Sequence, residues 1–148
     1  MKKFIVAFAA VVTVISASAF TGTKYGTNPA ESTFQNVFKG ALDVKWVEGK
    51  DIITASFVLG NTRAIAYFNN SGELLGTARN ILYNQLPLVV ITEINKYYGS
   101  ASVYDITEYT AGSETFYSMR ADLSNKQLKL RASSTGDITV ESKIKNKQ

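Results

Sequence analysis

The stretch AIAYFNNSGELLGTAR, residues 64–79, decides the fold of this chain, because it places a polar turn between two apolar segments. Polar residues 69–71 and Glu73 carry oxygen atoms around Gly72, so the turn could be either a ligand loop or a simple hairpin connection. A calcium loop takes several carboxylates as ligands, and only Glu73 supplies one here. Asparagine and glycine accept the positive φ angles that hairpin turns require. The sequence therefore predicts a β-hairpin and no metal site.

A helix and two further strands precede this hairpin. Residues 28–31, Asn-Pro-Ala-Glu, suit a helix start, with the asparagine as N-cap, the proline at N1 and the glutamate reaching back to the cap. Apolar residues then recur at helical spacing as far as Ala41. Residues 44–46 and 53–59 alternate between apolar and polar or smaller side chains, which predicts two strands.

The same series follows the hairpin. Pro87 opens a second helix, whose apolar face is predicted to continue to Tyr97 and Tyr98, and Gly99 provides a C-terminal stop. Strands are predicted after it at residues 103–110, 114–123, 127–132 and, as a short fourth strand, 138–141.

The two halves resemble one unit used twice, over residues 28–79 and 84–132. Their helices align at an offset of about fifty-four positions, and the turn at residues 69–72 finds a counterpart at residues 124–126. This predicts an α+β fold of tandem duplicated helix and antiparallel β-meander units, with both helices packed on one face of an antiparallel sheet. A coincidental likeness between two ordinary helix-and-meander segments is the alternative.

The N-terminus has the parts of a secretory signal peptide: two lysines, an apolar run at residues 4–15 and an A-x-A site that ends at Ala19. The run is shorter than the about 20 residues of a membrane-spanning helix. We expect cleavage after Ala19, a periplasmic or secreted location and no membrane anchor in the mature chain. Residues 1–19 are then the signal peptide, 20–142 a single domain, and 143–148 a polar basic tail.

Residue types exclude several kinds of chemistry. The chain has no histidine and no cysteine, so Ser-His-Asp and Cys-His centres, zinc sites of His and Cys, and disulfides cannot be built. The net charge of +4 depends on the two chain ends, which provides no clustered basic face for nucleic acid. We expect a non-enzymatic protein without cofactor, metal or nucleic-acid partner.

Three features together resemble a known family: an early helix leading to Val44-Lys45-Trp46, residues 64–79, and the helix start Leu86-Pro87. They resemble the small exported PepSY-like proteins of Bacteroidetes, which are similar to β-lactamase inhibitor proteins, over nearly the whole mature chain. The resemblance implies a tandem helix-and-meander fold and a non-enzymatic binding role outside the cytoplasm. PepSY-type domains are associated with restraining peptidases or other exported proteins. The family commonly has an acidic residue where this chain has Asn69, which argues further against a metal.

Basic and aromatic residues mark a candidate partner-binding surface. The basic ones occupy alternate positions of predicted neighbouring strands, and Tyr, Trp and Arg are the residues that anchor protein interfaces. The candidates are Trp46, Tyr109, Phe116, Arg120, Lys129 and Arg131. We expect the sheet face to engage a periplasmic or secreted protein or peptide. An ordinary charged outer face, with the aromatic residues in the core, is the alternative interpretation.

Two other functions remain as hypotheses. A small-ligand carrier would hold its ligand in an apolar pocket between sheet and helices, lined by residues such as Trp46, Phe57 and Tyr104. An enzyme would have to work with carboxylates alone, two of which must converge in a cleft. The candidate carboxylates are Asp43, Glu48, Asp51, Asp105, Glu108 and Glu114.

Overall fold

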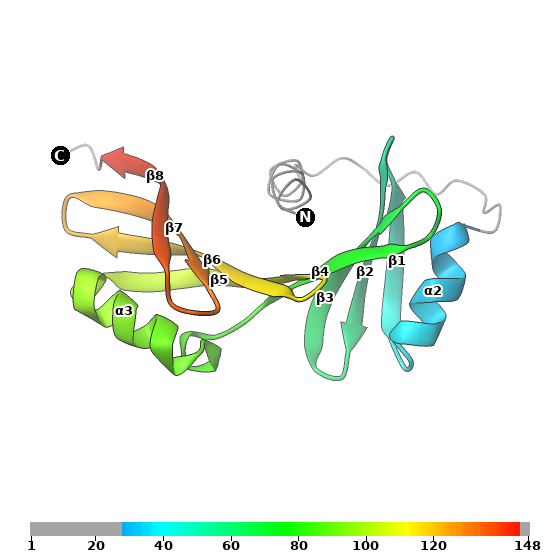
Figure 1. The fold of residues 1–148 in the computed structure, drawn as a ribbon, viewed down its shortest axis with the longest axis horizontal. Coiled ribbons are helices and arrows are strands. Elements are labelled where there is room, and N and C mark those ends of the chain that lie inside the picture. Colours follow the sequence, from blue (N-terminus) through cyan, green and yellow to red (C-terminus); the bar gives the residue numbers. More distant parts are fainter. Residues whose placement is uncertain (1–27, 146–148) are drawn as a thin grey trace.

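The computed structural model describes residues 28–145, in which two α-helices lie against an eight-stranded sheet (Figure 1). The predicted signal peptide lies outside the described residues. The elements are α2 (Pro29–Val37), β1 (Leu42–Glu48), β2 (Ile52–Leu59), β3 (Thr62–Asn69), β4 (Leu74–Asn80), the 3₁₀ turn η2 (Tyr83–Gln85), α3 (Leu88–Tyr98), β5 (Ser102–Ala111), β6 (Glu114–Leu123), β7 (Lys126–Ser133) and β8 (Ile138–Lys145).

The strands follow one another across the sheet in chain order, and each pairs antiparallel with the next. The sheet is continuous at its middle, because residues 77–80 of β4 pair with residues 107–110 of β5. This junction is the shortest of the pairings between consecutive strands, and the sheet twists strongly across it (Figure 1). The predicted α+β class and antiparallel order agree with this architecture.

Helix α2 begins as its sequence predicts. The Asn28 side chain accepts a hydrogen bond from the amide of Ala30 at 2.9 Å, and Pro29 occupies the first turn. The return bond predicted from the Glu31 side chain is not among the hydrogen bonds of the described residues. The helix ends at Val37, one turn before the predicted end at Ala41.

The core under α2 is aromatic. Ala30 and Phe34 are its buried residues, and Phe34 lies among the rings of Phe38, Trp46, Phe57 and Phe68. Apolar residues of β2 and β3 complete this cluster. A helix this short is marginal in water, so burial of these two side chains is what holds it to the sheet.

A second core lies under α3. Val90 and Ile94 are buried there, one turn apart, against apolar side chains of β5, β6 and β7. Gly99 caps the helix as predicted. Tyr97, predicted for the apolar face, is 63% exposed. That prediction is wrong, and the apolar face of α3 is narrower than predicted.

Both helices cover the same face of the sheet, as predicted. Ala66 of β3 lies in the α2 core and pairs with Thr77 of β4. The row of paired residues continues through Thr110 of β5 to Thr115 of β6. Directly paired residues share a face. Tyr117, two positions beyond Thr115 on β6, lies in the α3 core. We call the opposite side, which neither helix covers, the open face.

The turn at residues 69–72 is a hairpin connection, as predicted. The Asn69 side-chain oxygen accepts from the amides of Ser71 and Glu73, and the Glu73 carboxylate accepts from the Asn69 side-chain amide. The asparagine thus orders the turn internally, while Gly72 takes a φ of 85°.

The counterpart of this turn is residues 133–137 and not the predicted residues 124–126. In both turns the glycine amide donates to the first residue's carbonyl, at 3.0 Å for Gly72 and 3.1 Å for Gly136. Residues 124–126 lie one hairpin earlier, between β6 and β7. The second half also extends past residue 132 by the whole of β8, whose last three residues were predicted as the start of the tail.

Candidate binding surface

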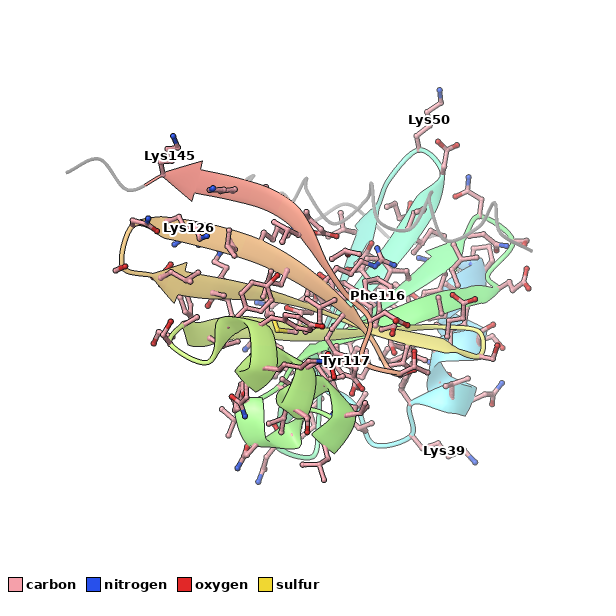
Figure 2. All side chains as sticks on the ribbon, turned by 60° about the vertical axis from the view of Figure 1, so that its left-hand side comes forward. Lys39, Lys50, Phe116, Tyr117, Lys126 and Lys145 are labelled. Carbon is pink, nitrogen blue, oxygen red and sulfur yellow. The ribbon has the colours of Figure 1, made fainter. Side chains whose placement is uncertain are left out.

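An aromatic and cationic stack crosses three strands on the open face. The rings of Tyr109 on β5 and Phe116 on β6 are stacked, with centroids 4.8 Å apart and planes 13° from parallel. The Arg131 guanidinium of β7 lies over the Phe116 ring, 3.6 Å from the ring centroid. Phe116 and its neighbour Tyr117 leave β6 on opposite sides, Tyr117 toward the α3 core (Figure 2). We call Tyr109, Phe116 and Arg131 the stack.

An apolar cluster joins the stack to the first half of the sheet. Tyr67, Ala78 and Tyr109 are its buried members. Partly buried hydrophobic residues pack around them, namely Ile52, Ile65, Leu75 and Phe116. The apolar cluster therefore runs without interruption from β2 to β6, across the short β4–β5 junction.

The ionisation of Tyr67 provides a test of this cluster. Burial, with a smaller contribution from the charge of Tyr109, raises the pKa of Tyr67 from 10.0 to about 12. A raised pKa means that the unfolded state loses its proton first, so stability is complete below pH 10 and falls as pH rises through 12. We expect alkaline denaturation titrations to lose on the order of 2 kcal/mol over this window. Tyr67→Phe should flatten the loss, whereas Tyr97→Phe, at an exposed site, should leave it unchanged.

The remaining predicted cations lie beside the stack. Arg120 approaches Asp105 at 3.6 Å, and Lys129 approaches Glu141 at 3.1 Å. Both pairs are solvent-accessible, and such pairs add little stability. Their side chains remain available to a partner at the edge of the apolar surface.

Trp46 does not join the other predicted residues. It lies on the helix-covered face, with its ring 5.3 Å from that of Phe34 and 5.9 Å from that of Phe68. Its inclusion in the binding surface is therefore corrected: Trp46 belongs to the α2 core. Tyr109, Phe116, Arg120, Lys129 and Arg131 share the open face.

Sequence reasoning missed Tyr67 and Tyr104 as residues of this face. Tyr104 donates to the Asp122 carboxylate at 3.0 Å and accepts from the Gln127 amide at 2.8 Å, which forms a polar group beyond the apolar cluster. Alternation along β3 was a usable signal for Tyr67, because the residues on either side of it, Ala66 and Phe68, belong to the core.

The pocket proposed between sheet and helices is not formed by its predicted lining. Trp46 and Phe57 pack in the α2 core, with Phe57 2% exposed, whereas Tyr104 lies on the open face. These side chains are on different sides of the sheet, so they cannot surround one ligand.

Three of the six candidate carboxylates are engaged, each with a different partner. Glu108 accepts from Arg79 at 2.6 Å, Asp105 faces Arg120, and Glu48 accepts from the Asn28 side chain. In the described part of the chain, no group of three or more Asp and Glu residues is placed to hold a metal ion. No helix between residues 28 and 145 has both the length and the apolar character to span a membrane.

An uninterrupted antiparallel sheet with two helices on one face is shared with solved structures, among them one described as BLIP-like, that is, similar to β-lactamase inhibitor proteins. No protein-family model and no curated protein matches the sequence. Solved structures do match. A BLIP-like protein from Bacteroides fragilis NCTC 9343 superposes with a TM-score of 0.71 and 18% identity, over 86% of this chain and 92% of that chain.

Two further structures share the fold. A DUF2874 family protein from Bacteroides ovatus ATCC 8483 gives a TM-score of 0.69 at 16% identity, over 83% of this chain and 89% of its own. An inferred periplasmic protein from Bacteroides eggerthii DSM 20697 gives 0.69 at 12% identity, over 82% and 90%. The resemblance to BLIP-like proteins of Bacteroidetes is thus confirmed at the level of the fold.

Proposed function

We propose that this protein is an exported, non-enzymatic binding module whose open face holds a protein or peptide. The observation that carries the proposal is the stack of Tyr109, Phe116 and Arg131, continuous with an apolar cluster that neither helix covers. Aromatic and arginine side chains supply most of the binding energy in protein interfaces. Their rings are already stacked here, so little side-chain entropy is lost on binding.

The sequence and the comparisons support this function. Without histidine or cysteine, Ser-His and Cys-His nucleophile centres and zinc sites of His and Cys cannot form. One structural neighbour is described as BLIP-like and another as an inferred periplasmic protein, which agrees with export through the predicted signal peptide. Inhibition of a β-lactamase is a narrower form of the proposal. Undiminished nitrocefin hydrolysis by several β-lactamases under excess protein would remove that narrower form.

A tandem duplication would account for the length of the open face. Each half has a helix, four strands, a bulge with an aspartate at positive φ in its first strand, and a glycine turn before its last strand. Buried helix positions correspond as well, Ala30 and Phe34 with Val90 and Ile94, at an offset of 60 positions in place of the predicted offset of about fifty-four. We propose that two copies of one unit were joined edge to edge through β4 and β5.

Site-specific photo-crosslinking tests the binding face. A photoreactive residue at Ser118, between the stack and Arg120 on the open face, should capture a partner from periplasmic extract. The same residue at Thr92, on the exposed surface of α3, should not capture it. Adding Phe116→Ala or Arg131→Ala to the Ser118 variant should reduce capture about tenfold, whereas Lys39→Ala should not. Equal capture at both positions, or capture that survives loss of Phe116, would reject the open face.

A further inference from the structure

A cavity opens where strand β1 separates from β2. Leu42 pairs with Val58 and Lys45 with Ser56, so two residues of β1 oppose the single residue Phe57. This is a β-bulge, and one of its residues, Asp43, has a φ of 53°. A cavity of about 380 Å³ lies at the bulge, near the small end of the roughly 300–1,000 Å³ of ligand sites.

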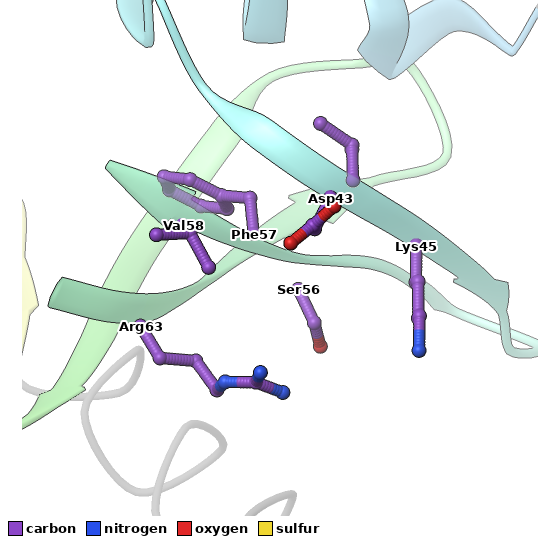
Figure 3. A pocket seen from close by; sticks show the side chains of 7 residues that line it. Asp43, Lys45, Ser56, Phe57, Val58 and Arg63 are labelled. Carbon is purple, nitrogen blue, oxygen red and sulfur yellow. The ribbon is translucent and has the colours of Figure 1, made fainter. Parts of the chain in front are cut away.

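The polar lining of this cavity carries opposite charges at separate places. Lys45, Ser56 and Arg63 come from three adjacent strands and extend to the same side of the sheet (Figure 3). Asp43 lies across from them at the bulge. Among residues 28–145, no ion pair engages Lys45, Arg63 or Asp43. The cavity thus offers two cations, a hydroxyl and one carboxylate.

The apolar lining comes from Val44, Phe57 and Val58. Val44 and Phe57 belong to the α2 core on the helix-covered side, so Val58 is the apolar residue on the side of Lys45, Ser56 and Arg63. A ligand that fills this space therefore needs an apolar group between a negative end and a hydrogen-bond donor.

The bulge on β5 shows what a closed version looks like. On β5, Asp105 has a φ of 50°, and Tyr104 beside it pairs with Arg120. Arg120 reaches Asp105 at 3.6 Å and neutralises it. In the bulge of β1, the residue equivalent to Arg120 is Val58, which has no charge and cannot neutralise an aspartate. Of these two bulges, the one on β1 therefore has an aspartate without an ion pair among the described residues.

We propose that this cavity binds the α-carboxylate end of an apolar amino-acid residue, supplied by a peptide C-terminus or by a free amino acid. The carboxylate would lie between Lys45 and Arg63 and accept from the Ser56 hydroxyl. The residue's own N–H would donate to Asp43, and its side chain would contact Val58.

This site is independent of the proposed function. The cavity lies on β1 to β3, and the stack lies on β5 to β7. Loss of partner capture in the Phe116→Ala variant would therefore leave the cavity intact, and an empty cavity would leave the open face able to bind.

Nuclear magnetic resonance titration with small probes tests the site. N-acetyl-leucine should shift the amide signals of residues 43–45, 56–58 and 63 and saturate with a Kd on the order of 1 mM, as expected for so few ligand atoms. N-acetyl-leucinamide, which lacks the charge, should bind at least about fivefold more weakly. Tighter binding of free leucine than of N-acetyl-leucine would identify a free amino acid as the ligand, and the reverse would identify a peptide C-terminus.

Variants at exposed positions separate binding from folding. Lys45→Met and Arg63→Met should each weaken N-acetyl-leucine binding about fivefold, and Lys129→Met, a cation on the other half of the sheet, should not change it. Unchanged melting temperatures would show that each variant is folded. The proposal is overturned if the amide analogue binds as tightly, if the shifts map elsewhere, or if both cation variants bind like the original protein.

Discussion

Replacing Phe34 with alanine is expected to lower the free energy of unfolding by about 3–5 kcal/mol, the range for losing a buried aromatic ring. Phe34 is 4% exposed. Its ring lies 4.9 Å from that of Phe57 and 5.3 Å from that of Trp46, both in edge-to-face contact. One side chain therefore joins α2 to the strands beneath it, and its loss leaves a cavity that the surrounding rings cannot fill.

Denaturant unfolding measures this effect, and near-ultraviolet circular dichroism should show the Trp46 signal collapse as its ring loses its contact. The matched control is Val37→Ala on the same helix, where the side chain is 52% exposed. We expect that change to stay within about 0.5 kcal/mol. A cost below about 1 kcal/mol for Phe34→Ala would show that α2 is held by something other than its aromatic contacts.

The sequence predicted the elements well because their local signals are strong. The Asn28 cap, the proline at N1 and the Gly72 turn each act within a few residues, and each is present as expected. Strand β8 shows where such signals weaken. Residues 138–141 were predicted as a short strand, but after Ile138 all of the described side chains of β8 are exposed, and residues 143–145, which continue the strand, were assigned to a tail.

Faces of the sheet were harder to predict than strands, and the bulges explain why. Tyr104 and Tyr109 lie an odd number of residues apart, so simple alternation places them on opposite faces. The bulge at Asp105 adds one residue and brings both to the open face. A non-glycine residue at positive φ has no reliable sequence signal. The candidate surface could therefore be proposed from composition, but Trp46 could be excluded from it only with the register known.

Substituting Gly72 with alanine is expected to destabilise the protein by about 2–5 kcal/mol, the sum of left-handed backbone strain and a forced displacement. Gly72 has a φ of 85°, and an added Cβ would collide with the Pro29 carbonyl oxygen. That oxygen is backbone at the first turn of α2, so relief requires the helix to move from the hairpin. The same glycine thus makes the turn and sets how closely the helix approaches it.

Two other glycines separate these contributions. Gly60 has a φ of 61° with nothing within 4 Å of an added Cβ, so Gly60→Ala should cost only the strain, about 1–2 kcal/mol. Gly136 has a φ of 95°, and its added Cβ would meet the Val89 side chain at 2.9 Å, which can shift more easily than backbone. Unfolding free energies should therefore fall least for Gly60→Ala, more for Gly136→Ala and most for Gly72→Ala. Equal losses of unfolding free energy for Gly60→Ala and Gly72→Ala would mean that the contact between Gly72 and the helix adds no stability. The turn at residues 69–72 would then act through its backbone angles alone.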